Sequence, residues 1–295
     1  MARAFSSSLI AGLLITLGSP SAQAQDDRTI NVIGRKPEEV RQEAKDFVRR
    51  TGVAERPVAR WIDPVCPQVM GVSAEIAARV EARIREIAKE VKARVAPQPC
   101  DGNILISFTS NGSAVIREIA AKGAGRLAEV SPNARALLLD GDLPIRWWHT
   151  SQERTKDGMR SMGNDAPPAV FQRSEQPGNV PLGGQVYQQY RPSFVSTQMV
   201  RALRSATIIV DANKAAGIPL DSVAAFAALV GLAEIELDDE TPPNSILSLF
   251  APAGPRDLTG LDRNFLHALY KLPLDRTALA HRGLLVRGLL NARGK

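Results

Sequence analysis

Apolar residues recur at helical spacing in one long segment of the N-terminal half. Five of them follow at intervals of 4, 4, 3 and 4 residues, namely Ile76, Val80, Ile84, Ile87 and Val91. This period predicts an amphipathic helix from residue 73 to about residue 95. Ser73 suits its N-cap, because a serine hydroxyl can accept from a free backbone N–H of the first turn.

Shorter patterns predict further elements on both sides of this helix. Strands are expected at residues 28–35, 103–108, 143–150, 185–195 and 206–210. Helices are expected at residues 36–50, around 115–119, at 219–235 with Gly231 as a break, and from Thr259 to Tyr270. This mixture predicts an α+β fold, with a mixed sheet and packed helices. Without a repeat or a sharp change of composition, residues 25–295 are expected to form a single domain.

The stretch from residue 151 to residue 184 is rich in Gly, Pro, Asn and Ser. It holds too few apolar side chains to form a core of its own. We therefore expect it to be an extended polar excursion on the surface.

The first 24 residues have the pattern of a secretory signal peptide. Arg3 precedes an apolar run at residues 9–17, and the small-residue triplet Ala22-Gln23-Ala24 follows. The run is far shorter than the about 20 residues that span a bilayer, which disfavours an uncleaved anchor. A periplasmic or secreted chain that starts near Gln25, without a transmembrane helix, is expected.

Cys66 and Cys100 are the only cysteines of the chain. In an oxidising compartment such a pair is expected to form a disulfide. Closing a loop of this length should raise the free energy of unfolding by roughly 3 kcal/mol. A redox-active pair is the alternative, but the wide spacing lacks the C-x-x-C arrangement that lowers a thiol pKa.

Composition and charge exclude several classes of protein. With 2 cysteines and 3 histidines, the chain has too few ligands for Cys-rich zinc modules or iron–sulfur clusters, and no cofactor is expected. The net charge is +6, but the 37 basic residues are dispersed among 31 acidic ones, which disfavours nucleic-acid binding. The basic C-terminal segment 275–295 could lie on an anionic membrane, although packing against its own domain is the commoner role.

Three segments near the C-terminus occur in a characteristic order. The apolar helix PLDSVAAFAALVGLAEI begins at Pro219, Ser245-Ile246-Leu247 follows, and Leu258-Thr259-Gly260-Leu261-Asp262 opens a helix that ends in Ala268-Leu269-Tyr270. This order resembles the C-terminal half of metzincin-type zinc peptidases, where a helix with H-E-x-x-H-x-x-G is followed by an S-I-M turn and an L-T-x-x-D helix. It is also similar to an uncharacterised group of secreted proteobacterial proteins.

The resemblance implies a zincin-like C-terminal half without the catalytic groups. With Gly231 on the motif glycine, Ala224, Ala225 and Ala228 replace the first histidine, the glutamate and the second histidine, and Leu247 replaces the turn methionine. Alanine offers neither a metal ligand nor a base, so zinc peptide hydrolysis is not expected. The alternative is that these residues are simply a buried helix and a turn.

His149 stands beside Arg146, Trp147 and Trp148, which are residue types that bind ligands by stacking, cation–π contact and proton transfer. Alternation along a strand places Trp147 and His149 on one face and Arg146 and Trp148 on the other. Trp147 is therefore expected in the core. Arg146 and Trp148 are candidate ligand contacts along a groove.

The remaining histidines and a group of acidic residues give little support for a metal site. His267 and His281 have no spacing that pairs them with His149. Acidic residues between 234 and 240 lack the spacing of a calcium-binding loop and are expected to be solvated.

Three functions remain in competition. The first is a non-catalytic, zincin-like binding or scaffold protein, whose partner would be an envelope protein or a small ligand. The second is a hydrolase with His149, Glu153 and Glu234 at its site and the polar excursion as a lid. The third is an envelope structural or partner-docking protein.

Overall fold

The computed structural model describes residues 36–123, 127–155, 196–197 and 199–293. The described residues form one compact unit, as expected for a single domain. The predicted signal peptide, the predicted strands at 28–35 and 185–195, and most of the polar excursion lie outside the described residues.

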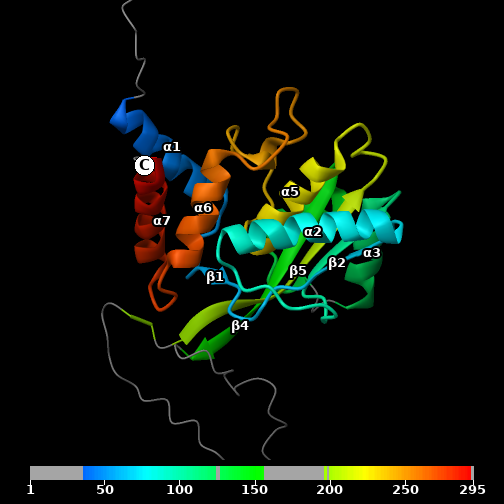
Figure 1. The fold of residues 1–295 in the computed structure, drawn as a ribbon, viewed down its shortest axis with the longest axis horizontal. Helices are drawn as coiled ribbons and strands as arrows, with labels where there is room; N and C mark the ends of the chain where they lie inside the picture. Colours follow the sequence, from blue (N-terminus) through cyan, green and yellow to red (C-terminus); the bar gives the residue numbers. More distant parts are fainter. Residues whose placement is uncertain (1–35, 124–126, 156–195, 198, 294–295) are drawn as a thin grey trace, which may run out of the picture. The chain divides into compact units, whose positions relative to one another are not determined.

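A five-stranded mixed sheet forms the centre of this unit (Figure 1). Its strands are β1 (Ala59–Arg60), β2 (Pro67–Met70), β3 (Ile104–Thr109), β4 (Ile145–Thr155) and β5 (Met199–Asp211). β5 is the central strand: it runs parallel to β1 and β3 on one side and antiparallel to β4 on the other. β2 extends the sheet beyond β3. The predicted mixed sheet with packed helices is confirmed.

Helices cover both faces of the sheet. On one face lie α2 (Ala74–Glu90) and α5 (Leu220–Leu232), with α2 crossing in front of the strands in Figure 1. On the other face lie α3 (Gly112–Lys122) and α4 (Pro132–Asp140). The alternation of β4 follows this division, because Trp147 donates a hydrogen bond to Ile235, just beyond α5, whereas Arg146 donates to Leu138 in α4.

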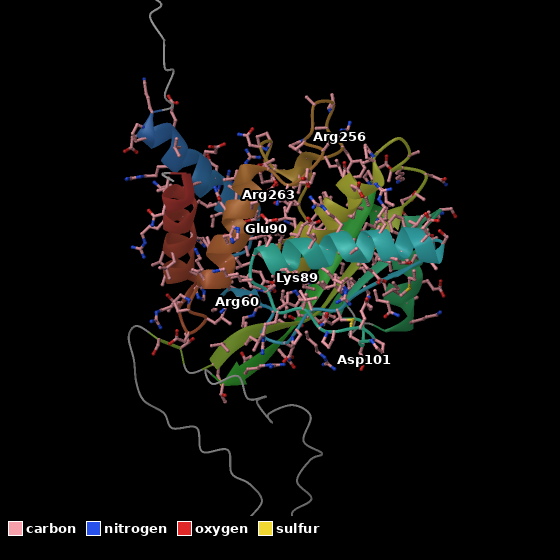
Figure 2. All side chains as sticks on the ribbon, in the orientation of Figure 1. Arg60, Lys89, Glu90, Asp101, Arg256 and Arg263 are labelled. Carbon is pink, nitrogen blue, oxygen red and sulfur yellow. A yellow bond between two sulfur atoms is a disulfide. The ribbon has the colours of Figure 1, made fainter. Side chains whose placement is uncertain are left out.

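Three further helices pack beside the sheet, namely α1 (Pro37–Arg50), α6 (Gly260–Lys271) and α7 (Ala278–Arg293). The rings of Phe47 in α1 and Phe265 in α6 meet edge to face, with centroids 5.2 Å apart. An ion pair between Arg263 of α6 and Glu90 of α2 links this group to the sheet layer (Figure 2). Among the described residues, no helix has both the length and the apolar composition needed to cross a membrane.

Several predicted boundaries are wrong for identifiable reasons. α2 begins after its Ser73 cap as predicted but ends at Glu90, because Lys92 takes a left-handed conformation with φ of 65°. Gly231 does not break its helix but lies within α5. β4 continues to Thr155 beyond a bulge at Thr150, so that Ser151–Thr155, assigned to the polar excursion, are strand residues. The backbone N–H and C=O groups of these polar residues are paired with β5, and the composition of the segment does not reveal this partner.

Cys66 and Cys100 form a disulfide, as the sequence predicts, with their Cα atoms 6.2 Å apart. The segments on either side of α2 fold back along it, since the backbone N–H of Val65 donates to Arg94 and that of Ala96 donates to Val65. The bridge therefore fastens the segment that follows α2 to the start of β2.

Candidate functional site

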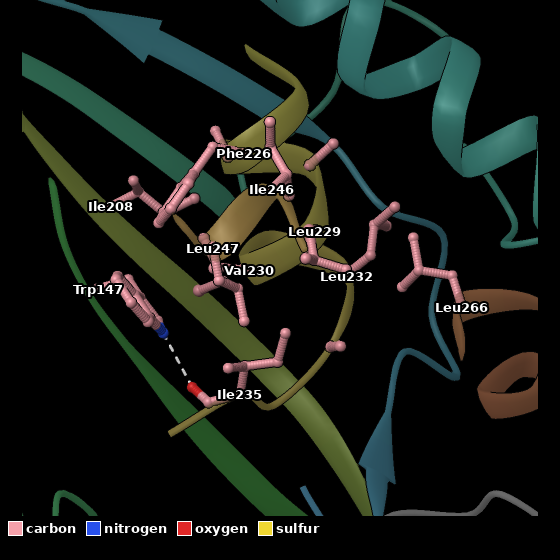
Figure 3. Close-up of a cluster of buried hydrophobic side chains, with 14 of the residues drawn as sticks. Trp147, Ile208, Phe226, Leu229, Val230, Leu232, Ile235, Ile246, Leu247 and Leu266 are labelled. Carbon is pink, nitrogen blue, oxygen red and sulfur yellow. Dashed lines mark hydrogen bonds between the residues drawn. The ribbon is translucent and has the colours of Figure 1, made fainter. Parts of the chain in front are cut away.

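Helix α5, which carries the resemblance, is enclosed by other elements. Every residue from Ser222 to Leu232 is buried, and Figure 3 shows its apolar side chains among those of the sheet, the turn after it and α6. Ala224, Ala225 and Ala228 have no exposed surface. These three positions therefore face packed protein rather than an open cleft.

Gly231 allows α5 to lie close against the sheet. A Cβ atom at this position would stand 2.9 Å from Cγ2 of Ile104 in β3. The indole N–H of Trp61 donates to the Gly231 carbonyl over 2.8 Å, which fixes the end of the helix. Absence of a side chain at Gly231 thus sets the spacing between α5 and β3.

The turn and the helix that follow α5 are joined by one carboxylate. Asp262 is fully buried and accepts hydrogen bonds from the Ser245 hydroxyl at 2.5 Å, from the Ile246 N–H at 2.9 Å and from both the N–H and the hydroxyl of Thr259. Burial raises the pKa of Asp262, although these bonds act in the opposite direction. The turn Ile246–Ser248, with Leu247 buried, is held against the start of α6 in this way.

Tyr270, at the end of the L-T-x-x-D helix, reaches back to α5. Its hydroxyl donates to the carbonyl of Leu232 over 3.0 Å, and burial raises the pKa of this phenol. The guanidinium of Arg60 lies 5.8 Å from the centre of the Tyr270 ring. The three segments that carry the resemblance therefore interlock through Asp262 and Tyr270.

A pocket lined by both polar and apolar side chains lies beside the edge strand β4. Trp147, Trp148 and His149 of β4 contribute to its wall. Three further segments complete the lining: residues 52–56 after α1, residues 129–134 at the start of α4, and residues 234–237 after α5. The cavity volume is about 70 Å³, and because one water needs about 10–15 Å³ on this measure, the pocket has room for about five to seven waters.

His149 is neutral in this pocket. Its Nε2 lies 2.6 Å from the carbonyl oxygen of Val230, and because a carbonyl only accepts, Nε2 must carry the proton. Burial lowers the pKa of the ring. Nδ1 is consequently the nitrogen with the lone pair, which can accept a hydrogen bond or a proton.

Glu234 lies at the same pocket and is held by two arginines. Arg201 of β5 donates to both of its oxygens over 2.7 Å, and Arg56 donates to one of them over 3.1 Å. Arg201 also donates to the hydroxyl of Ser151. Glu129 accepts from the N–H and the hydroxyl of Ser151, the latter over 2.6 Å. The strand bulge thus carries a hydrogen-bonded network of two carboxylates and two guanidinium groups.

The structure brings His149, Glu234 and Trp148 to one pocket, but not the other two predicted site residues. Glu153 is exposed and does not line the pocket. Arg146 has no exposed surface, and its guanidinium donates to three backbone carbonyls and to the Ser113 hydroxyl. Such a saturated cation holds α3, α4 and β4 together and has little left to offer a ligand.

The remaining candidates do not converge either. His267 lies on α6, and His281 of α7 is fully buried, accepting from the Val58 N–H and donating to the Pro273 carbonyl. Across the part of the chain that the structure describes, no three residues among His, Cys, Asp and Glu are grouped to hold a metal ion.

Sequence reasoning missed Arg201, Glu129 and Ser151 as members of the pocket network. Arg201 and Ser151 are 50 residues apart and meet only through the pairing of β4 with β5. No local pattern in the sequence signals this pairing or the bulge that redirects Ser151.

Comparison of the chain with protein families, with curated proteins and with solved structures gave no match in any of the three.

Proposed function

We propose that the chain is a periplasmic or secreted, non-catalytic binding protein with a zincin-like C-terminal half. In this proposal α5 corresponds to the helix that carries the zinc ligands in the peptidases, but it has neither the ligands nor the catalytic carboxylate. The ligand or partner is bound elsewhere, at the pocket beside β4.

The complete burial of Ala224, Ala225 and Ala228 carries the non-catalytic part of the proposal. In the alignment that the resemblance implies, their methyl groups take the positions of two imidazoles and a carboxylate, and the surrounding side chains leave no exposed surface there. A zinc ion does not fit this donor set, because methyl groups supply neither electron pairs nor a proton acceptor.

The hydrogen bonds between the motif segments support the zincin-like part of the proposal. In the resemblance, the helix, the turn and the L-T-x-x-D helix follow one another. Here Asp262 bonds the turn to the start of α6, and Tyr270 bonds the end of α6 to the end of α5.

Metal analysis of the purified chain tests the proposal. We expect zinc far below one atom per chain after mild purification, and no change of the melting temperature on addition of a chelator. Stoichiometric zinc that a chelator removes, with a fall in stability, would overturn it.

A hydrolase is the second candidate, favoured by the convergence of His149 and Glu234 on one pocket. A neutral imidazole with a free Nδ1 lone pair is a competent general base, provided that a substrate reaches it. Glu153, the third residue predicted for this site, is not part of the pocket.

A hydrolase screen with two matched variants separates the two functions. His149→Ala removes the candidate base, whereas His267→Ala removes a histidine outside the pocket. Activity that survives in His267→Ala and disappears in His149→Ala, with both variants folded by circular dichroism, would establish the enzyme. The binding-protein proposal expects no activity in any of the three proteins.

A further inference from the structure

We infer that the pocket beside β4 binds an organic cation, a guanidinium or alkylammonium group such as the end of an arginine or lysine side chain. This inference rests on the proposed binding function and specifies the chemistry of the ligand. Three independent features of the pocket support it.

The first feature is an excess of negative charge at the pocket and its rim. Four glutamates line the pocket: Glu55, Glu129, Glu234 and Glu236. Glu234 is matched by Arg201 and by Arg56, which also lines the pocket, and Glu55 lies 3.4 Å from Arg282. Glu129 lies 4.0 Å from Arg201. In the described part of the chain Glu236 has no cationic partner, so its charge is available to a ligand.

The loop beyond Glu236 adds further acidic groups. Asp238 and Asp239 follow on the same segment, and a hydrogen bond with Asp238 together with its negative charge raises the pKa of Asp239. Arg50 lies 3.4 Å from Glu240 and offsets part of this charge. The loop therefore adds to the negative field at the rim without lining the pocket itself.

The second feature is the buried ring of His149. Only 8 % of its surface is exposed, and Nδ1 has no hydrogen-bond partner among the described residues. Because Nε2 holds the proton, Nδ1 can only accept. A ligand that contacts it must donate, which excludes carboxylates and admits guanidinium and ammonium groups as well as neutral donors; the negative charge of the pocket then favours the cations among them.

The third feature is the size of the pocket and its aromatic wall. A volume of about 70 Å³ suits the few heavy atoms of a guanidinium or ammonium group but not a folded segment. Trp147 and Trp148 contribute to the wall, against which the hydrocarbon part of such a side chain can pack. The pocket is therefore matched to the end of one side chain or to a small free cation.

Titration of the purified chain with arginine methyl ester and with citrulline methyl ester tests the inference. Both esters are used with the α-amino group acetylated, so that the two ligands have nearly the same shape and only the guanidinium side chain of the arginine ester carries a charge. We expect a Kd of about 1 mM for the arginine ester, as is ordinary for a ligand of this size, and at least tenfold weaker binding of the citrulline ester. Equal binding of the two esters, or binding of neither, would overturn the inference.

Two charge variants locate the site. Glu236→Gln should weaken binding of the arginine ester at least threefold. Glu75→Gln removes the same charge from the exposed surface of α2 and should leave binding unchanged. Equal effects of the two substitutions would show non-specific attraction and refute the assignment to this pocket.

A direct readout comes from the ¹⁵N resonance of Nδ1 in His149. This resonance should move when the arginine ester binds, since Nδ1 then accepts a hydrogen bond, and should stay in place with the citrulline ester. Titration with Gly-Arg-Gly amide distinguishes the source of the cation. Tighter binding of this peptide than of the arginine ester indicates a side chain of a partner protein, whereas equal binding indicates a small free ligand. If the chain contains no zinc and has no hydrolase activity but does not bind the arginine ester, the inferred cation site is refuted while the proposed non-catalytic binding function is not.

Discussion

Two glycines inside helices should respond to the same substitution in opposite ways. Gly231 lies in α5 and Gly283 in α7. Alanine favours a helix over glycine by about 1 kcal/mol, and this gain applies to both positions. Only the surroundings differ: a Cβ at residue 231 would approach Cγ2 of Ile104 to 2.9 Å, whereas a Cβ at residue 283 would meet nothing within 4 Å.

The difference between the two variants therefore measures the cost of overpacking. Carbon atoms pack best at about 3.5–4.0 Å, so the contact with Ile104 forces α5 or β3 to shift, at about 1–3 kcal/mol. Gly283→Ala should stabilise the chain by about 0.5–1 kcal/mol. Gly231→Ala should lose up to about 2 kcal/mol, since the overpacking cost exceeds the gain in helix propensity.

Urea unfolding followed by circular dichroism gives both free energies on one scale. Melting temperatures provide a second measure, at about 2–4 °C per kcal/mol for a domain of this size. Shifts of equal sign and size in the two variants would refute the close contact of α5 with the sheet. The spacing at Gly231 would then not be what keeps α5 enclosed.

Three other changes test separate parts of the fold. Reduction of the Cys66–Cys100 disulfide should lower the free energy of unfolding by about 3–4 kcal/mol, and an unchanged melting temperature in dithiothreitol would contradict this. Burial lowers the pKa of both His149 and His281, so the folded chain holds these rings neutral, whereas the unfolded chain protonates them below about pH 6.5. The free energy of unfolding should therefore be highest above that pH and fall as the pH drops toward the lower pKa values of the folded chain. Equal urea midpoints at pH 7.5 and 5.5 would contradict this. Ala228→His should destabilise the chain by about 2 kcal/mol or more because it places a large polar ring in a closed core, whereas a tolerated variant that gains zinc affinity would reveal a cleft.

Elements with a strong local signal are the ones that the sequence predicts well. The period of α2 and the cap at Ser73 depend on neighbours within four residues, and both are present. The same reasoning misplaces the end of β4, because its polar residues become strand only through pairing with β5. Local pattern predicts an element, and long-range pairing decides where it stops.

The candidate site was predictable to a smaller extent for the same reason. His149 and Glu234 are recognisable as reactive residue types, and both reach the pocket. Arg146 is an equally suitable residue type for binding a ligand, but its guanidinium donates to backbone carbonyls in α4 and in the segment that follows α4. Which polar residue is saturated and which is available depends on backbone groups that a sequence pattern does not display.

The position of β5 at the middle of the sheet has a consequence for how the chain is made. β3 can pair with β5 only after residues about 100 positions later have been synthesised, since Ile104 is opposite Ala206. β1 pairs with β5 alone in the sheet. A growing polypeptide that has emerged only as far as α4 thus holds unpaired strand edges. The sheet can be completed only when the last third of the chain is made, and chains truncated before β5 should be prone to aggregate.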